Sequence, residues 1–277
     1  MGLRVSTNTQ SISAQRTLQL TINAQKASME KLASGSRIYR AGDDAAGLAI
    51  AETMRSHIRS IRQDVRNAND GISLIQTAEG GMSEISNTLV RFRELSIQAA
   101  SDTINDSERS LIDKEVQQLR ADIDRIAFST EYNGHKLLSG EDGLKDIQVG
   151  LGNNPETDRI SFDPAKTNIT AAALGVSDIT VVTKEDAQKY LTVLDESIGR
   201  LMERRSELGA LQNRLQSAVN NMLVYDENLS AARSRIFDVD MASETAELTK
   251  QNILASASTS VLSQANQNNL LALKLLA

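Results

Sequence analysis

Apolar residues recur at alternating steps of three and four along most of the chain, the spacing of one face of an α-helix. The first such register is carried by Leu18, Ile22, Met29 and Leu32. Glycines and the pair Asp43-Asp44 interrupt the pattern over residues 34–47, as is typical of a loop or bend. A helical pattern then resumes near residue 45. The pattern therefore predicts two helices joined by an irregular segment.

The second of these helices meets two apparent interruptions, Asn69-Asp70-Gly71 and Gly80-Gly81. One register spans the second interruption, so we expect the helix to continue at a cost of about 1 kcal/mol per glycine relative to alanine. Further on, Asn105 followed by Glu108 resembles a capping box and predicts the start of another helix. We expect that helix to end near Gly134, because glycine supplies a left-handed C-cap.

The middle of the chain has a different composition. Residues 134–182 contain six of the fifteen glycines and both prolines, Pro155 and Pro164. Short alternations of apolar and polar residues occur at 147–149, 159–162 and 179–182. Such runs between turn residues predict one or two small β-hairpins.

The second arm carries the longest helical pattern. After a cap signal at Thr183 and Asp186, one register extends from Leu191 to Ile236. A helix over 184–235 would be about 75 Å long, and it needs partner helices along its length. A last register follows, made of Leu254, Val261, Leu271 and Leu275.

These patterns predict a mainly α fold. Long antiparallel helices from both termini form coiled-coil-like core domains, and a small β-hairpin region lies in the middle. Polar residues in the terminal registers would fix the pairing but weaken it, and an isolated two-helix seam is marginal in water. We therefore expect the terminal helices to be weakly ordered in the monomer and to fold fully on assembly.

The amino-acid composition argues against most kinds of catalytic site. The chain has no cysteine and only two histidines, His57 and His135. It contains no phosphate-binding loop, dinucleotide fingerprint, zinc-protease helix or nucleophile elbow. Asp43-Asp44 is expected to be a solvated acidic turn rather than a metal site. The sequence thus predicts no enzyme, no metal and no cofactor.

Net charge and hydropathy limit the classes of partner that the sequence predicts. A net charge of −6 and a pI near 5.1 disfavour nucleic acid as a partner, and the arginines at 55, 59, 62 and 66 are expected to form a solvated face or intersubunit ion pairs. No apolar run approaches the roughly 18 residues of a membrane span. Polar residues stand at 7–11, where a secretion signal would be apolar. Aromatic residues make up 3% of the chain, which is low for a single large core.

Several sequence blocks together resemble the bacterial flagellins. The first arm contains Ala-Gly-Asp-Asp-Ala-Ala-Gly-Leu-Ala-Ile at 41–50 and Arg-Asn-Ala-Asn-Asp-Gly-Ile-Ser at 66–73. Further matching blocks lie at 34–38, 77–80, 93–98 and 132–134, and, in the second arm, at 208–214, 232–236, 238–240, 259–262 and 264–267. The resemblance covers about residues 1–140 and 185–277, and it is to a short flagellin without large variable outer domains. Asn268-Asn269 stands where many members have a proline, so the last helix is expected to continue.

The resemblance implies a structural subunit of the flagellar filament, exported through the flagellar type III apparatus and secreted without a cleaved signal. It implies an inner coiled-coil domain from residues 1–44 and 237–277, an outer helical domain from 45–140 and 183–236, and a hairpin-rich segment at 141–182. It also implies filament-core packing by the terminal registers, namely Leu18, Ile22, Met29, Leu32, Leu254, Val261, Leu271 and Leu275.

The resemblance further implies partners. These are other copies of the chain in a helical homopolymer, an export chaperone, and the filament cap and hook-junction proteins. The expected chaperone segment consists of Leu270, Leu271, Leu273, Leu275 and Leu276. A host Toll-like receptor is a further candidate partner, with expected contacts at Arg91, Arg93, Glu94, Leu95 and Glu115.

Two alternatives remain open at this point. A hook–filament junction protein has similar terminal helices, although the blocks at 41–50 and 66–73 favour a flagellin. A membrane-surface protein is suggested by the lipidation-like start at Gly2 and by the apolar C-terminus.

Overall fold

The computed structural model describes the chain from residue 7 to residue 274, and its side chains up to residue 267. The described residues divide into two compact units. One unit comprises the chain up to Ile58 together with the chain from Asn228 onward, and the other is Arg59–Glu227. Among the residues searched, no helix is both long enough and apolar enough to span a membrane.

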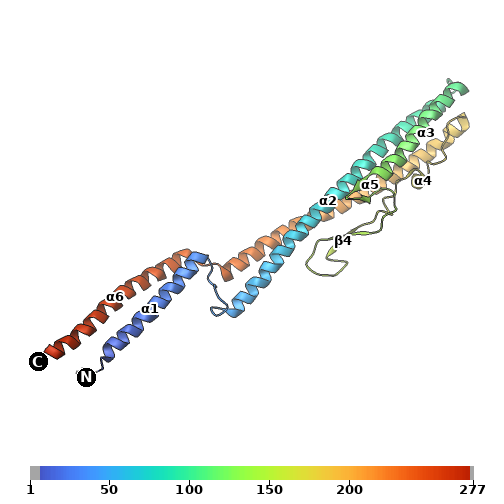
Figure 1. The fold of residues 1–277 in the computed structure, drawn as a ribbon. Helices are drawn as coiled ribbons and strands as arrows, with labels where there is room; N and C mark the ends of the chain where they lie inside the picture. The colour runs from blue at the N-terminus through green and yellow to red at the C-terminus, as the bar shows by residue number, and fades with distance from the viewer. Residues whose placement is uncertain (1–6, 275–277) are drawn as a thin grey trace. The chain divides into compact units, whose positions relative to one another are not determined.

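The first unit is dominated by α1 (Thr9–Ser34) and α6 (Met241–Lys274), which lie side by side and antiparallel (Figure 1). The side chain of Asn8 caps the start of α1 by accepting the N–H of Ser11 at 3.0 Å. Gly35 ends α1 with a φ of 69°, a left-handed conformation that glycine adopts without strain. The uninterrupted course of α6 to Lys274 confirms the expectation drawn from the missing proline.

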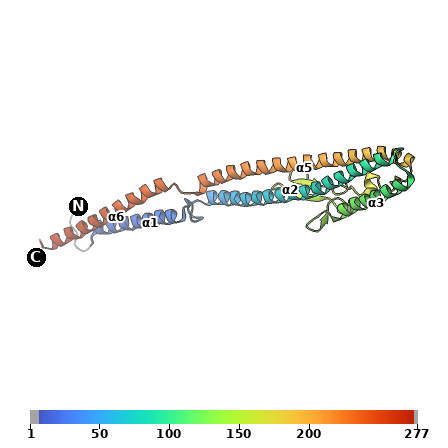
Figure 2. The same ribbon diagram turned by 90° about the horizontal axis from the view of Figure 1, so that it is seen from above.

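The second unit is built from three helical stretches that Figure 2 shows along one another. They belong to α2 (Ala45–Ala99), α3 (Asp106–Ser129) and α5 (Lys184–Phe237). Apolar residues at the predicted spacing are fully buried here, including Met82, Leu89 and Phe92 of α2, Val116 and Ile123 of α3, and Leu194 and Leu201 of α5. The predicted capping box is present, with the Glu108 N–H donating to Asn105 and the Asn105 N–H donating to Glu108.

Two hairpins lie in the middle of the chain. β1 (Glu131–Tyr132) pairs with β2 (His135–Lys136), and β3 (Lys145–Gln148) pairs with β4 (Arg159–Phe162), both antiparallel. The second hairpin confirms the strands predicted from the first two alternating runs. A single helical turn, α4 (Ala171–Leu174), follows.

Two predictions for this region were wrong. α3 ends at Ser129, and Gly134 is not its cap. Instead Asn133 and Gly134, with φ of 51° and 78°, form the two-residue turn between β1 and β2, where both central residues need positive φ. Glycine occurs both at the C-caps of helices and in two-residue hairpin turns, so the presence of Gly134 alone could not distinguish the two.

The run 179–182 is irregular and is not a strand. Ile179 and Val181 are buried, and their backbone groups are satisfied by α3 side chains rather than by a neighbouring strand. Gln117 donates to the carbonyl of Ile179 at 2.9 Å, and the N–H of Val181 donates to Asp113 at 2.9 Å. The alternation of apolar and polar residues indicated which side chains are buried. It did not indicate which groups form hydrogen bonds with the backbone.

The glycines inside α2 allow the central segment to approach the helix closely. A Cβ at Gly71 would lie 2.5 Å from Cδ1 of Ile147, and a Cβ at Gly81 would lie 2.7 Å from Cδ1 of Leu138. Gly80, by contrast, faces open space. The helix continues through both predicted interruptions, and two of these glycines serve packing rather than bending.

Candidate assembly surface

Small and polar side chains form the contact between α1 and α6. The buried positions are Thr21 and Ser28 of α1 and Ala265 of α6. Hydrogen bonds fix the register along the pair. Gln25 donates to Asn252 at 2.5 Å, and Asn8 donates to the carbonyl of Ala265 at 3.0 Å. A contact of this kind sets alignment well but buries little apolar surface.

The predicted apolar registers are only partly covered by this contact. Ile22, Met29, Leu254 and Val261 are exposed, with 42% of Ile22 and 59% of Val261 accessible, while Leu18 and Leu32 are half-buried. Four of the residues predicted to pack in the filament core, Ile22, Met29, Leu254 and Val261, are therefore exposed in the single chain, and we call them the exposed register. Of the other predicted packing residues, the side chain of Leu271 and all of Leu275 lie outside the described residues.

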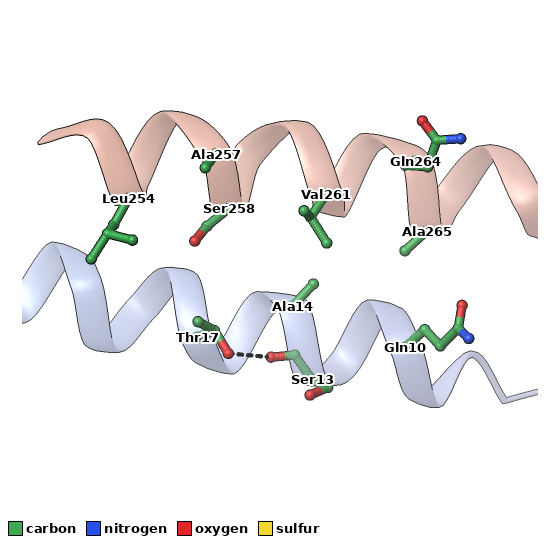
Figure 3. A pocket seen from close by; sticks show the side chains of 10 residues that line it. All are labelled: Gln10, Ser13, Ala14, Thr17, Leu254, Ala257, Ser258, Val261, Gln264 and Ala265. Carbon is green, nitrogen blue, oxygen red and sulfur yellow. Dashed lines mark hydrogen bonds between the residues drawn. The ribbon is translucent and has the colours of Figure 1, made fainter. Parts of the chain in front are cut away.

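Part of the exposed register borders a groove between α1 and α6 (Figure 3). The groove has a volume of about 540 Å³. In the close-up, Leu254 and Val261 point from α6 toward α1, where Ala14 and Thr17 face them. Its full lining is Gln10, Ser13, Ala14, Thr17, Leu254, Ala257, Ser258, Val261, Gln264 and Ala265. An apolar groove along a helix pair is suited to receiving another helix.

The acidic turn before α2 is confirmed as a structural element. Asp43 accepts the N–H groups of Tyr39 and Arg40, and these bonds lower the pKa of its carboxyl group. Asp44 accepts the N–H of Gly47 at 2.8 Å, in the first turn of α2. Both carboxylates therefore hold the backbone of the turn. In the part of the chain that was searched, no three His, Cys, Asp or Glu side chains are grouped to hold a metal.

The predicted receptor contacts all lie on the second unit, and all but one of them are accessible. Arg91 binds Glu115 through Nη2 at 2.9 Å and Glu94 through Nη1 at 3.2 Å, and these bonds raise the pKa of its guanidinium group. Arg93 donates to Asp195 at 2.7 Å, which likewise raises the pKa of Arg93. Leu95 is only 2% exposed and belongs to the core. Its side chain therefore offers no surface for a partner.

Two arginines of the run on α2, Arg55 and Arg62, form ion pairs within the chain. Arg62 donates to Asp226 of α5 at 3.0 Å, and Arg55 lies 3.2 Å from Glu52. Arg66 donates to Gln63.

Sequence reasoning missed a different basic residue, Arg109, which is buried and donates to the carbonyls of Ala99 and Ser101 at the end of α2. No signal in the sequence distinguished it from an exposed arginine.

The fold defines a class of protein: a mainly helical protein whose long terminal helices expose large apolar side chains. Comparison with known proteins agrees. The family model for the bacterial flagellin N-terminal helical region matches residues 5–142, and that for the bacterial flagellin C-terminal helical region matches residues 191–275. The chain belongs to the bacterial flagellin family.

Individual relatives extend this match over almost the whole chain. A flagellin of Halalkalibacterium halodurans is 44% identical, with 98% of this chain and 99% of that protein covered. The flagellar filament 33 kDa core protein of Treponema phagedenis is 42% identical, with 95% and 96% covered. The crystal structure of Bacillus cereus flagellin matches with a TM-score of 0.51 and 28% identity, over 57% of this chain and 88% of that one.

These comparisons confirm the prediction that the chain is a filament subunit. The chain is a structural subunit that polymerises into the bacterial flagellar filament used for motility, and it is not an enzyme. The near-complete match to flagellins decides for this function over a hook–filament junction protein.

Proposed function

We propose that the exposed register of α1 and α6 is the surface by which subunits pack in the core of the filament. The observation that carries this proposal is the exposure of large apolar side chains beside a groove, on a helix pair whose own contact is small and polar. Each such side chain that becomes fully buried contributes about 1.5–3 kcal/mol. Burial in neighbouring copies therefore supplies stabilisation that the single chain lacks.

Substitution at Val261 tests this proposal. Val261→Asp places a charge in the packed core and should abolish polymerisation, because burying an unpaired carboxylate is strongly unfavourable. Val261→Ile is the matched control and should polymerise normally. Filament length and yield would be measured by electron microscopy and sedimentation. Normal filaments from the aspartate variant would show that Val261 stays exposed after assembly.

We also propose the layer assignment that follows from this surface. Residues 1–44 and 237–277 form the inner layer, 45–140 and 183–236 the outer helical layer, and 141–182 its hairpin segment. The breaks at 44 and 236 fall next to helix ends, since α2 begins at Ala45 and α5 ends at Phe237. Deletion of residues 255–277 should abolish filaments but preserve most helical circular dichroism, because the second unit has its own core. Loss of most of that signal would contradict the assignment.

For export, we propose that the leucine-rich C-terminus is held by a flagellar export chaperone before secretion by the type III route. The support is the composition of the segment, since Leu270, Leu271, Leu273, Leu275 and Leu276 fall within seven residues. Replacing Leu273 and Leu276 by serine should abolish co-purification with the chaperone. Unchanged co-purification would place the chaperone contact elsewhere. After export, the cap and hook-junction proteins are the proposed partners at the filament ends.

We propose recognition by a host Toll-like receptor through the ion-paired residues of α2 and α3. Arg91, Arg93, Glu94 and Glu115 are all partly accessible and are already held in a fixed arrangement by their salt bridges. Arg91→Ala should reduce the response of receptor-expressing reporter cells to purified monomer. Lys189→Ala, an exposed change on α5, is the control. Absence of any response to saturating wild-type monomer would remove the proposal.

A further inference from the structure

A depression in the second unit brings together three separate stretches of chain. α2 contributes Ile61 and Asp64, the β3–β4 loop contributes residues 149–152, 157 and 158, and α5 contributes residues 221, 222 and 225. Its volume is about 340 Å³, at the small end of the range for ligand sites in proteins. Apolar walls come from Ile61, Val149, Leu151 and Met222. The depression is thus deep enough for a small organic group.

Asp64 is the exceptional residue of this depression. It is only 6% exposed, and within residues 7–267 no side chain or backbone group hydrogen-bonds or ion-pairs with its carboxylate. Its oxygens are not among the fully enclosed polar atoms, so the carboxylate opens onto the depression and keeps some contact with solvent while it lacks a protein partner. Burial and the nearby charge of Asp158 raise the pKa of Asp64. The side chain therefore lacks the positive partner that such sites normally contain.

The loop opposite Asp64 is held in place by its own hydrogen bonds. Gln148 donates to the carbonyls of Gly150 and Gly152, at 2.6 and 2.9 Å. Asp158 accepts the N–H of Asn154 at 2.9 Å. A Cβ on either glycine would collide with the Asp158 carboxylate, so only glycine lets the loop fold this closely. A preformed wall lowers the conformational cost of binding.

The remaining lining residues favour a positively charged ligand. The lining contains two carboxylates, Asp64 and Asp158, and no lysine or arginine. Tyr225 adds an aromatic ring at the accessible side, and Asn221 adds an amide. Aromatic faces attract ammonium and guanidinium groups, and carboxylates form their strongest hydrogen bonds with the same groups.

We propose that this depression binds an organic cation, an ammonium or guanidinium group on a short apolar stem, with Asp64 as its counter-ion. The charged head lies against Asp64, and the stem lies against the apolar walls. A basic side chain from another copy of the chain and a free small-molecule amine share this chemistry. The experiment below separates these two sources.

Binding would be measured on the full-length monomer by titration with n-butylammonium and n-butylguanidinium, followed by NMR chemical shifts. The neutral n-butylurea serves as the matched ligand. The cations should bind saturably and more tightly than the urea, and Asp64→Asn should weaken them by about tenfold or more. Asp70→Asn, an exposed acid on the same helix, should leave binding unchanged. Tyr225→Leu, a change at a partly exposed site, should weaken the cations and not the urea.

The filament distinguishes the two sources. Binding to monomer but not to filament, with slower polymerisation in the presence of the cation, identifies a basic side chain of a neighbouring copy. Equal binding to both identifies a free amine, and each of these results supports the proposal. Cations that bind no better than the urea would overturn it. So would equal binding by Asp64→Asn, or a site that takes Ca²⁺ and ignores both organic cations. The monomer titration does not depend on assembly.

Discussion

The two compact units hold their helices together by different means. In the second unit, large apolar side chains such as Phe92, Met82 and Leu201 are completely buried between helices. In the first, the fully buried positions of α1 and α6 are Thr21, Ser28 and Ala265, and the large apolar residues of the two helices are half-buried or exposed. Burial of apolar area is the dominant stabilising contribution in folding. The comparison leads us to expect that the second unit is stable as one chain, whereas the first gains stability from neighbouring copies.

The largest expected effect comes from the core of the second unit. Phe92→Ala should lower the free energy of unfolding by about 3–5 kcal/mol, because it removes a fully buried ring and leaves a cavity. Urea denaturation of the monomer, followed by circular dichroism, measures this loss. A loss under 1 kcal/mol would mean that this core contributes no more than the α1–α6 contact.

The next effect concerns the approach of the central segment to α2. Gly81→Val should destabilise the second unit by about 1–3 kcal/mol, since the new side chain collides with Leu138 and Thr130. Gly80→Ala is the control, because it faces open space and should stabilise the helix by up to about 1 kcal/mol. If both variants gained stability, the close packing at Gly81 would be disproved.

A smaller effect should depend on pH. The pKa of Asp64 is raised in the folded state, chiefly by burial, so the folded protein binds this proton more tightly than the unfolded chain does. Stability from this group is therefore greatest below its unfolded pKa near 3.8 and declines as the pH rises through the folded value. Asp64→Asn should accordingly be more stable than the wild type at pH 7, with the difference narrowing toward pH 4. Denaturation midpoints across this range would show it. A difference that grows as the pH falls would contradict the assignment.

The smallest effect on the monomer is expected at the exposed register. Ile22→Ala should change the free energy of unfolding by less than about 0.5 kcal/mol, since Ile22 lies at the surface of the single chain, where 42% of it is accessible. The same change should raise the critical concentration for polymerisation. On one preparation, the free energy of unfolding is measured by denaturation and the critical concentration by sedimentation. A large loss in the monomer with unchanged assembly would reverse the comparison between the units.

Most of the helices could be predicted because the signals that start and maintain them are local in the sequence. The start of α3 was predictable because Asn105 and Glu108 satisfy the first N–H groups of the helix themselves. α5 was predictable because one apolar face is maintained from Leu191 to Met222, where it is buried. Signals that depend on distant partners were less informative. The turn at Gly134 and the irregular run at 179–182 depend on what packs against them.

The candidate surface was predictable in part. The 3/4 register grouped Ile22, Met29, Leu254 and Val261 with Leu18 and Leu32, but it could not say that these four are exposed in the single chain. The contact within the chain uses small residues at the same spacing, such as Thr21 and Ser28, and hydropathy ranks them low. Asp64 gave no signal at all, because its burial is produced by a loop more than 80 residues away in sequence.

Hydrogen exchange of monomer and filament tests the central claim most directly. Amides of α1 and α6 should exchange rapidly in the monomer and become strongly protected in the filament, whereas amides around Phe92 and Leu201 should be protected in both. This result would show that the first unit gains its stability from neighbouring subunits. Equal protection of α1, α6 and the second unit in the monomer would contradict the account.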